Sequence, residues 1–295
     1  MPAIHTIDLQ FQGVPGLIAG FLLQSGGDLA LVETGPGSCQ PALIEGLKAL
    51  GVTPRDVHHV FLTHIHLDHS GGAGWWAQQG AQVYVHEKGA PHVVDPARLI
   101  SSATRIYGER MDTLWGPILP APGERVTVLQ DGDQVTVGDM VIQAWDTPGH
   151  ARHHLAYVLG NACFTGDVAG VRLAGCDYLS VAAAPPQFEP APYVASVDRL
   201  RAGFFKKLYL THFGEVSGPE DHLNRYRQRI MDVHQQITGW MEQGLKGDEL
   251  AQRLAASERE VSGVSDADWA RYEVINGTAM CAAGIELSVM KAASR

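Results

Sequence analysis

The stretch His64-Ile65-His66-Leu67-Asp68-His69 decides the interpretation of this chain, because it places three imidazoles and one carboxylate within six residues. It follows Val57–Thr63, a run rich in β-branched residues that predicts a strand. Side chains two apart on an extended segment point the same way, so His64 and His66 can bind one ion together. A turn after His66 brings Asp68 and His69 toward a second ion. Imidazole and carboxylate suit zinc, iron and manganese, so the stretch predicts a metal site.

Three later segments follow the same design, in which a strand ends and a histidine or aspartate comes directly after it. A single strand-end His or Asp is a weak signal, because it often only solvates a turn. Four such segments in succession favour one shared site, since functional residues on sheet scaffolds gather in the loops at strand ends. The three segments are Asp146-Thr147-Pro148-Gly149-His150, Phe164-Thr165-Gly166-Asp167 and Tyr209-Leu210-Thr211-His212-Phe213-Gly214.

The composition narrows the choice of partners. The formal net charge of −10 disfavours nucleic acid, which is bound by neutralising phosphates with Lys and Arg. Neither a basic run nor an apolar stretch of roughly 20 residues is present to indicate a membrane partner. We therefore expect a small-molecule substrate. The first residues lack the pattern of a secretory signal, and the four cysteines are widely spaced, so we expect free thiols and a cytoplasmic protein.

Hydrophobic patterning predicts two groups of strands separated by helices. Leu17–Ser25 and Asp28–Thr34 form a hairpin around Gly26-Gly27. The alternating segments Arg125–Leu129, Gln134–Val137 and Met140–Trp145 predict an antiparallel meander. Two packed sheets with helices outside them fit this order.

Two regions have helical spacing. Apolar residues recur three and four positions apart between about residues 96 and 116, which predicts a helical insertion that either faces the core or covers a pocket. Beyond Pro219 the pattern is helical throughout, over Glu220–Gln243, Lys246–Ala256 and Asp266–Lys291. We therefore predict a catalytic domain over residues 1–218 and a helical subdomain over residues 219–295. The last helix carries small residues and could pack on the domain or on a partner subunit, and of the two we favour a homodimer.

Taken together, the motifs resemble those of the metallo-β-lactamase-fold superfamily, the αββα hydrolases that include glyoxalase II, lactonases and ribonuclease Z. The resemblance covers about residues 10–215. It implies an α/β fold, a four-layer αββα sandwich, here with a C-terminal helical extension. It also implies two divalent metal ions, with zinc expected and iron or manganese as alternatives. The ligands it implies are His64, His66 and His150 for the first ion, Asp68, His69 and His212 for the second, and Asp167 as the bridge.

Five further residues are candidates for supporting or pocket positions. The resemblance places Glu33 of Glu33-Thr34-Gly35 where the family has an aspartate, one methylene shorter. His154 matches the second histidine of the family's Pro-Gly-His-x-x-Gly-His turn, and His153 stands in place of a family glycine. Tyr107 and Tyr178 are aromatic residues in segments expected to border the site, although core packing is the competing interpretation for both.

The implied reaction is hydrolysis of a small ester, lactone or thioester by a hydroxide that bridges the metal ions. Asp68 is the candidate catalytic residue, as a ligand that also accepts a proton. A histidine at position 66 favours hydrolysis over the flavodiiron branch, which has a glutamate there. An iron-dependent oxidoreductase that resembles the persulfide dioxygenases remains the alternative, because the same ligands suit iron. Val168–Arg172 lacks the Gly- and Cys-containing stretch of glyoxalase II, so we do not expect glyoxalase II itself.

Overall fold

The computed structural model describes residues 2–294, and their packing divides the chain into two compact units. The first unit extends to Asp146 and also takes in His153–Gly166. The second contains Thr147–Arg152 and the described chain from Asp167 onward. The domain boundary expected between residues 218 and 219 stays a prediction.

The first unit contains a six-stranded mixed sheet in the order β1-β2-β3-β4-β5-β6. The first three strands are antiparallel, and β3 to β6 are parallel. Gly26 has a φ of 61° in the turn between β2 and β3, which confirms the hairpin predicted there. The strands are β1 (Ala3–Asp8), β2 (Ala19–Ser25), β3 (Asp28–Val32), β4 (His59–Phe61), β5 (Gln82–His86) and β6 (Val126–Leu129).

The same unit contains four antiparallel strands of a second sheet, in the order β10-β9-β8-β7. The predicted meander is therefore wrong in its first member, because β6 pairs in parallel with β5, with Val126 opposite Val83. Alternation of polar and apolar residues defines a half-buried strand but does not specify its neighbour. The four strands are β7 (Gln134–Val137), β8 (Met140–Asp146), β9 (Leu155–Leu159) and β10 (Ala162–Gly166).

Aromatic side chains fill the space between these two sheets. Phe21 and Phe164 have ring centroids 5.4 Å apart, and Phe61 meets Tyr157 edge-on at 5.2 Å. The Tyr157 hydroxyl donates to the Leu62 carbonyl at 2.8 Å, so a buried polar group is satisfied at the end of β4. These contacts fix the position of the chain at the end of β4, just before the histidine motif.

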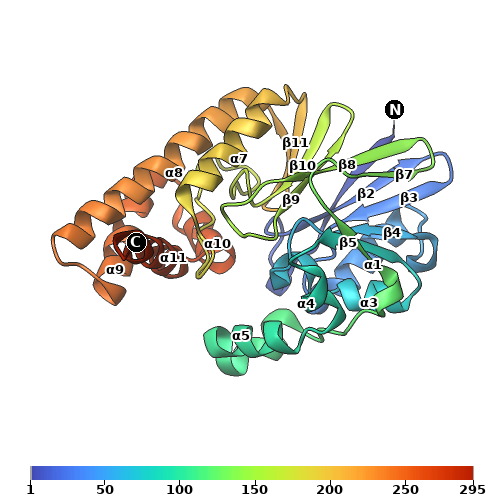
Figure 1. Ribbon diagram of the computed structural model, residues 1–295, viewed down its shortest axis with the longest axis horizontal. Helices are drawn as coiled ribbons and strands as arrows, with labels where there is room; N and C mark the ends of the chain where they lie inside the picture. The colour runs from blue at the N-terminus through green and yellow to red at the C-terminus, as the bar shows by residue number, and fades with distance from the viewer. Residues whose placement is uncertain (1, 295) are drawn as a thin grey trace. The chain divides into compact units, whose positions relative to one another are not determined.

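Helices complete the first unit (Figure 1). Among them, α1 contacts β1, α3 contacts β5 and α4 contacts β6. The helical stretch predicted between Pro96 and Trp115 is interrupted at Gly108, whose φ of 55° ends the first helix. The helices are α1 (Gln40–Ala49), α2 (Leu67–Ser70), α3 (Ala73–Gln78), α4 (Ala90–Val94), α5 (Ala97–Tyr107) and α6 (Met111–Trp115).

The second unit is mostly helical, with one strand pair. Helices α7 and α8 run side by side, and α8 also contacts α9 and α11 (Figure 1). The single helix predicted over Asp266–Lys291 is two helices, because the Asn276 side chain donates to Ser180 Oγ and to the Val181 carbonyl instead of continuing a helical surface. The elements are α7 (Pro190–Ala202), β11 (Lys207–Leu210), β12 (Gly214–Ser217), α8 (Pro219–Glu242), α9 (Gly247–Ser262), α10 (Asp266–Ile275) and α11 (Thr278–Ala293).

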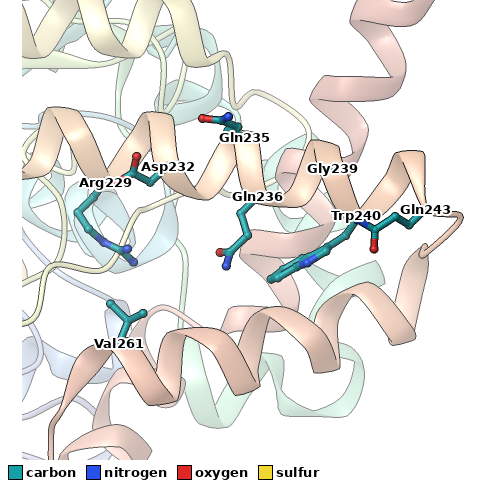
Figure 2. Close-up of a pocket in the computed structure, with 8 residues that line it drawn as sticks. All are labelled: Arg229, Asp232, Gln235, Gln236, Gly239, Trp240, Gln243 and Val261. Carbon is teal, nitrogen blue, oxygen red and sulfur yellow. The ribbon is translucent and has the colours of Figure 1, made fainter.

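Helix α8 buries one face, because Leu223, Tyr226, Ile230, Val233 and Ile237 recur at three- and four-residue spacing. Its other side borders a polar cavity of about 510 Å³ next to α9 (Figure 2). The lining residues are Arg229, Asp232, Gln235, Gln236, Gly239, Trp240, Gln243 and Val261, none of which is a candidate ligand. In residues 2–294, no helix has the length and apolar content required to span a bilayer.

The core of the first unit can be tested at Phe61, which is fully buried and also stacks on Tyr84 at 4.6 Å. We expect Phe61→Ala to lower the free energy of unfolding by about 3–5 kcal/mol, because it removes apolar contacts and leaves a cavity. Urea denaturation measures the change. Phe204→Ala is the matched control, since Phe204 is 88% exposed and its truncation should change stability by less than about 0.5 kcal/mol. Equal effects would contradict the assigned core.

A second prediction concerns His222 on α8, which is buried and whose Nε2–H donates to the Ala169 carbonyl at 2.8 Å. Burial lowers the pKa of His222 to about 4. As the pH falls below about 6.5, the unfolded chain binds a proton at this residue that the folded chain does not, so the free energy of unfolding decreases until about pH 4. Between pH 7.5 and pH 5 the decrease should be roughly 2 kcal/mol.

The variant His222→Gln keeps an N–H donor at this position and removes the titrating group. Between pH 7.5 and pH 5, the free energy of unfolding of this variant should therefore decrease by roughly 2 kcal/mol less than that of the wild type. Unfolding curves at the two pH values measure this difference, and identical pH dependence in the two proteins would show that His222 is not buried in its neutral form.

Candidate metal centre

The first unit brings together the four candidate ligands of the motif that follows β4. His64 and His69 are fully buried, and His66 and Asp68 are half-buried. His66 has extended backbone angles and precedes α2, so the chain turns directly after it. His64 Nε2 lies 3.0 Å from His66 Nδ1, and Asp68 Oδ2 lies 3.6 Å from His69 Nε2. The motif therefore forms two pairs of converging ligand atoms, as its spacing predicts.

Glu33 supports one member of each pair. Its carboxylate is fully buried, and its Oε1 lies 2.9 Å from His69 Nδ1. The Thr63 hydroxyl donates to the same oxygen and lies 3.1 Å from His64 Nδ1. Because that hydroxyl uses its proton on Glu33, it accepts from the His64 Nδ1–H. Both imidazoles then carry their proton on Nδ1, which leaves each Nε2 able to bind a metal ion.

Glu33, which is one methylene longer than the aspartate of the family, thus contacts a candidate ligand histidine. Its backbone has a φ of 65°, which is uncommon for a residue with a side chain. Thr63 links Glu33 to His64 and was given no role from the sequence. The only sequence signal for such a role is that Thr63 directly precedes the histidine motif.

Three of the other candidates lie close to this motif within the first unit. The His153 ring is stacked 6.1 Å from His64 and lies 5.6 Å from His66, and the His154 ring lies 5.0 Å from His64. Burial raises the pKa of Tyr107 to about 12, with the negative charge of Asp68 adding to the effect. The helical insertion therefore brings an aromatic hydroxyl into the field of Asp68.

The second unit brings together the remaining three candidate ligands. His150 follows β8, Asp167 follows β10 and His212 follows β11 in the sequence, and all three are buried. Asp167 Oδ2 lies 3.3 Å from His150 Nε2, and Asp167 Oδ1 lies 3.4 Å from His212 Nε2. One carboxylate thus directs its two oxygens at two different imidazoles. This arrangement is compatible with a carboxylate that is shared between two metal ions.

The segment around His150 is held by α7. Ser196 Oγ donates to the Pro148 carbonyl at 2.6 Å, and the Glu189 N–H donates to the Gly149 carbonyl at 2.8 Å. Gly149 has a φ of 131°, and a Cβ there would lie 2.2 Å from the Tyr193 backbone, so only glycine fits. His150 Nδ1–H donates to the Ala182 carbonyl at 3.0 Å, which leaves its Nε2 facing Asp167.

Tyr178, the remaining pocket candidate, is bonded into the helices of the second unit. Its hydroxyl donates to Glu258, and the guanidinium of Arg229 lies 5.7 Å from its ring centre. Burial raises the pKa of Tyr178 far above its usual range, and the Glu258 charge adds to this effect. These contacts agree with the packing interpretation of this residue.

All seven candidate ligands belong to groups of imidazole and carboxylate side chains that could hold a metal ion. The donor set fits a divalent metal such as zinc, iron or manganese. The fit is supported in each unit separately, because ligand atoms converge while the opposite nitrogens of His64, His69 and His150 are bonded elsewhere.

A core of two sheets and this donor set define a metal-site protein of the αββα class. Residues 13–212 match the family model of the metallo-beta-lactamase superfamily. This match covers more than half of the chain, and the chain therefore belongs to that superfamily. The family and the four-layer α/β fold predicted from the sequence are both confirmed.

Individual relatives support the same assignment. A metallo-beta-lactamase fold-containing protein of Sulfurisphaera tokodaii is 27% identical over 173 residues, which are 57% of this chain and 65% of that protein. A hydroxyacylglutathione hydrolase of Hahella chejuensis is 29% identical over 178 residues, which are 59% of this chain and 52% of that protein. The chain thus spans less than two thirds of the length of these relatives.

The fold extends beyond the segment matched by the family model. A metallo-beta-lactamase family protein of Thermus thermophilus has a TM-score of 0.65 to this structure at 22% identity, and the match covers 99% of this chain and 94% of that chain. At this level of identity the likeness concerns the fold alone, and it includes the C-terminal helices.

The support that Glu33 provides can be tested by its removal. We expect Glu33→Ala to weaken zinc binding about 10- to 100-fold, because the His69 Nδ1–H and the Thr63 hydroxyl lose their acceptor. Competition with a chromophoric chelator measures this affinity. Glu45→Ala removes an exposed carboxylate of a surface ion pair and should leave the affinity unchanged. Wild-type affinity in Glu33→Ala would show that the buried carboxylate does not orient the ligands.

Proposed function

We propose that this chain is a metal-dependent hydrolase with a dinuclear site that cleaves a small ester, lactone or thioester. The observation that carries the proposal is the Asp167 carboxylate, whose two oxygens face His150 and His212 at 3.3 and 3.4 Å. In this proposal His64, His66 and His150 hold one ion, and Asp68, His69 and His212 hold the other. Zinc is the proposed metal, and iron or manganese would suit the same donors.

Divalent ions held by these residues would lower the pKa of a bound water to about 7 and so would supply a nucleophile near neutral pH. The protein supplies the ligand atoms, and one of its side chains accepts a proton during the reaction. Asp68 is the proposed acceptor, because it is half-buried beside His69 and carries a carboxylate. The neighbouring Tyr107 hydroxyl stays protonated at neutral pH and is available as a hydrogen-bond donor to a substrate.

The name of one relative and the net charge of the chain support the proposed substrate class. The name of the Hahella chejuensis relative designates a hydrolase of an acylglutathione, which is a thioester. A net charge of −10 disfavours nucleic acid and anionic membranes as partners, so we propose a small molecule. We also propose a cytoplasmic location and a homodimer.

The metal assignment predicts the effect of Asp167→Asn. The amide is neutral and a poorer metal ligand, so metal content should fall from roughly two ions per chain to one or fewer. Elemental analysis of protein reconstituted with zinc and then desalted measures this ratio. Asp139→Asn removes an exposed carboxylate in a turn and should keep the wild-type ratio. Two ions retained by Asp167→Asn would contradict the bridging role.

The reaction class is tested with the reconstituted wild type on p-nitrophenyl esters, lactones, acyl thioesters and phosphodiesters. We expect turnover of at least one carboxylic ester, lactone or thioester, and we expect Asp68→Ala to lower it by at least about 100-fold. Oxygen consumption with a thiol substrate, together with inert esters, lactones and thioesters, would replace this proposal by the iron-dependent oxidoreductase.

A further inference from the structure

Two buried tyrosine hydroxyls connect the segments that carry His150 and Asp167. Tyr193 on α7 and Tyr226 on α8 are both fully buried, and their hydroxyl oxygens lie 2.7 Å apart. Tyr193 also reaches the Asp167 carbonyl at 2.6 Å, and Tyr226 also reaches the Ala182 N–H at 3.3 Å. Sequence reasoning gave neither tyrosine a role, because a tyrosine in a helical segment has no signature beyond packing.

The direction of every hydrogen bond in this connection follows from proton counting. A phenol has a single proton, and Tyr193 donates its proton to the Asp167 carbonyl, which can only accept. Tyr226 must therefore donate to Tyr193, and its own oxygen accepts from the Ala182 N–H. One assignment satisfies all the groups, and a satisfied buried network is rigid.

The connection continues to the His150 imidazole. Ala182 donates its N–H to Tyr226 and accepts the His150 Nδ1–H at its carbonyl oxygen, at 3.0 Å. An unbroken series of hydrogen bonds thus runs from the His150 ring through Ala182, Tyr226 and Tyr193 to the backbone of Asp167. It joins the two residues whose side chains face each other at 3.3 Å.

We propose that Tyr193 and Tyr226 are positioning residues that hold the His150 imidazole and the Asp167 carboxylate in register for a metal ion. This inference rests on the proposed metal site and adds to it residues beyond the ligands. It also gives the C-terminal helices a role in the site, since α8 supplies one of the two hydroxyls.

Neighbouring residues also fix the backbone on either side of Ala182. Asn276 donates its side-chain amide to the Val181 carbonyl at 3.1 Å, and Cys281 Sγ lies 3.4 Å from that oxygen. Gly284 lies against Ala183, the residue after Ala182, since a Cβ at Gly284 would be 1.9 Å from the Ala183 carbonyl oxygen. The segment that presents Ala182 is therefore fixed on both sides of it, by Asn276 at the end of α10 and by Cys281 and Gly284 of α11.

A purely structural role is the competing explanation, and Tyr272 offers a matched control. It is also buried, and it lies in the same unit on α10. Its hydroxyl donates to the Tyr178 carbonyl at 2.8 Å and accepts the Leu173 N–H at 3.1 Å. Its bonds are of the same kind as those of Tyr226, but they do not lead to the residues around His150.

The experiment compares full-length wild type, Tyr226→Phe, Tyr193→Phe and Tyr272→Phe by titration of zinc against a chromophoric chelator. We expect Tyr226→Phe and Tyr193→Phe each to weaken zinc binding in at least one of the two binding steps by about 10-fold or more. Tyr272→Phe should stay within about 2-fold of the wild type. Because the two hydroxyls act in series, the double variant should bind about as weakly as either single variant.

A second measurement needs no metal. Hydrogen exchange of the Ala182 amide in metal-free protein should become faster in Tyr226→Phe, which removes its acceptor, and should change little in Tyr272→Phe. If one phenylalanine variant does not fold, the other still decides the zinc comparison.

The outcomes separate this inference from the proposed function. Wild-type affinity in both Tyr226→Phe and Tyr193→Phe, or an equal loss in Tyr272→Phe, would overturn the positioning role and leave the metal site standing. A wild-type protein that binds no divalent ion would overturn the proposed function and this inference together.

Discussion

The interaction on which the candidate site depends is the hydrogen bond that three of its buried imidazoles make with the second ring nitrogen. His69 is bonded to Glu33, His64 to Thr63 and His150 to the Ala182 carbonyl. A neutral imidazole has one donor and one acceptor nitrogen, so each of these bonds decides which nitrogen is left to bind a metal ion. Without them, buried histidines would be free to rotate or to carry their proton on the wrong nitrogen.

The two compact units meet this requirement in different ways. The first uses a side-chain carboxyl group, that of Glu33, which reaches one histidine directly and a second through the Thr63 hydroxyl. The second uses neutral groups: the Ala182 carbonyl accepts from His150, and the Ala182 N–H donates to Tyr226, whose hydroxyl donates to Tyr193. A buried carboxylate needs several donors to offset its desolvation, and Thr63 and His69 provide them. The tyrosines remain uncharged, because burial raises the pKa values of both.

Much of this could be predicted from the sequence because metal ligation leaves a local signature. The spacing of ligands in a motif is set by backbone geometry. The four candidates His64, His66, Asp68 and His69 all lie in the short segment that follows β4. The family was predictable for the same reason. Strand partners were less predictable: β6 was expected beside β7 and pairs with β5, since alternation is the same in either sheet. The break at Asn276 depends on contacts with Ser180 and Val181, nearly a hundred residues away.

The sequence alone thus determined the family and the seven candidate ligands in their order, because those properties reside in short motifs and strand ends. Only the tertiary structure decided which groups orient the ligands. Glu33 and His69 are 36 residues apart, and Tyr193 and Tyr226 are 33 residues apart. Hydrogen bonds between residues so distant in the chain exist only once helices and sheets have packed, and no periodicity or spacing records them. The identity of the ligands is a local property of this chain, and their orientation is a property of its packing.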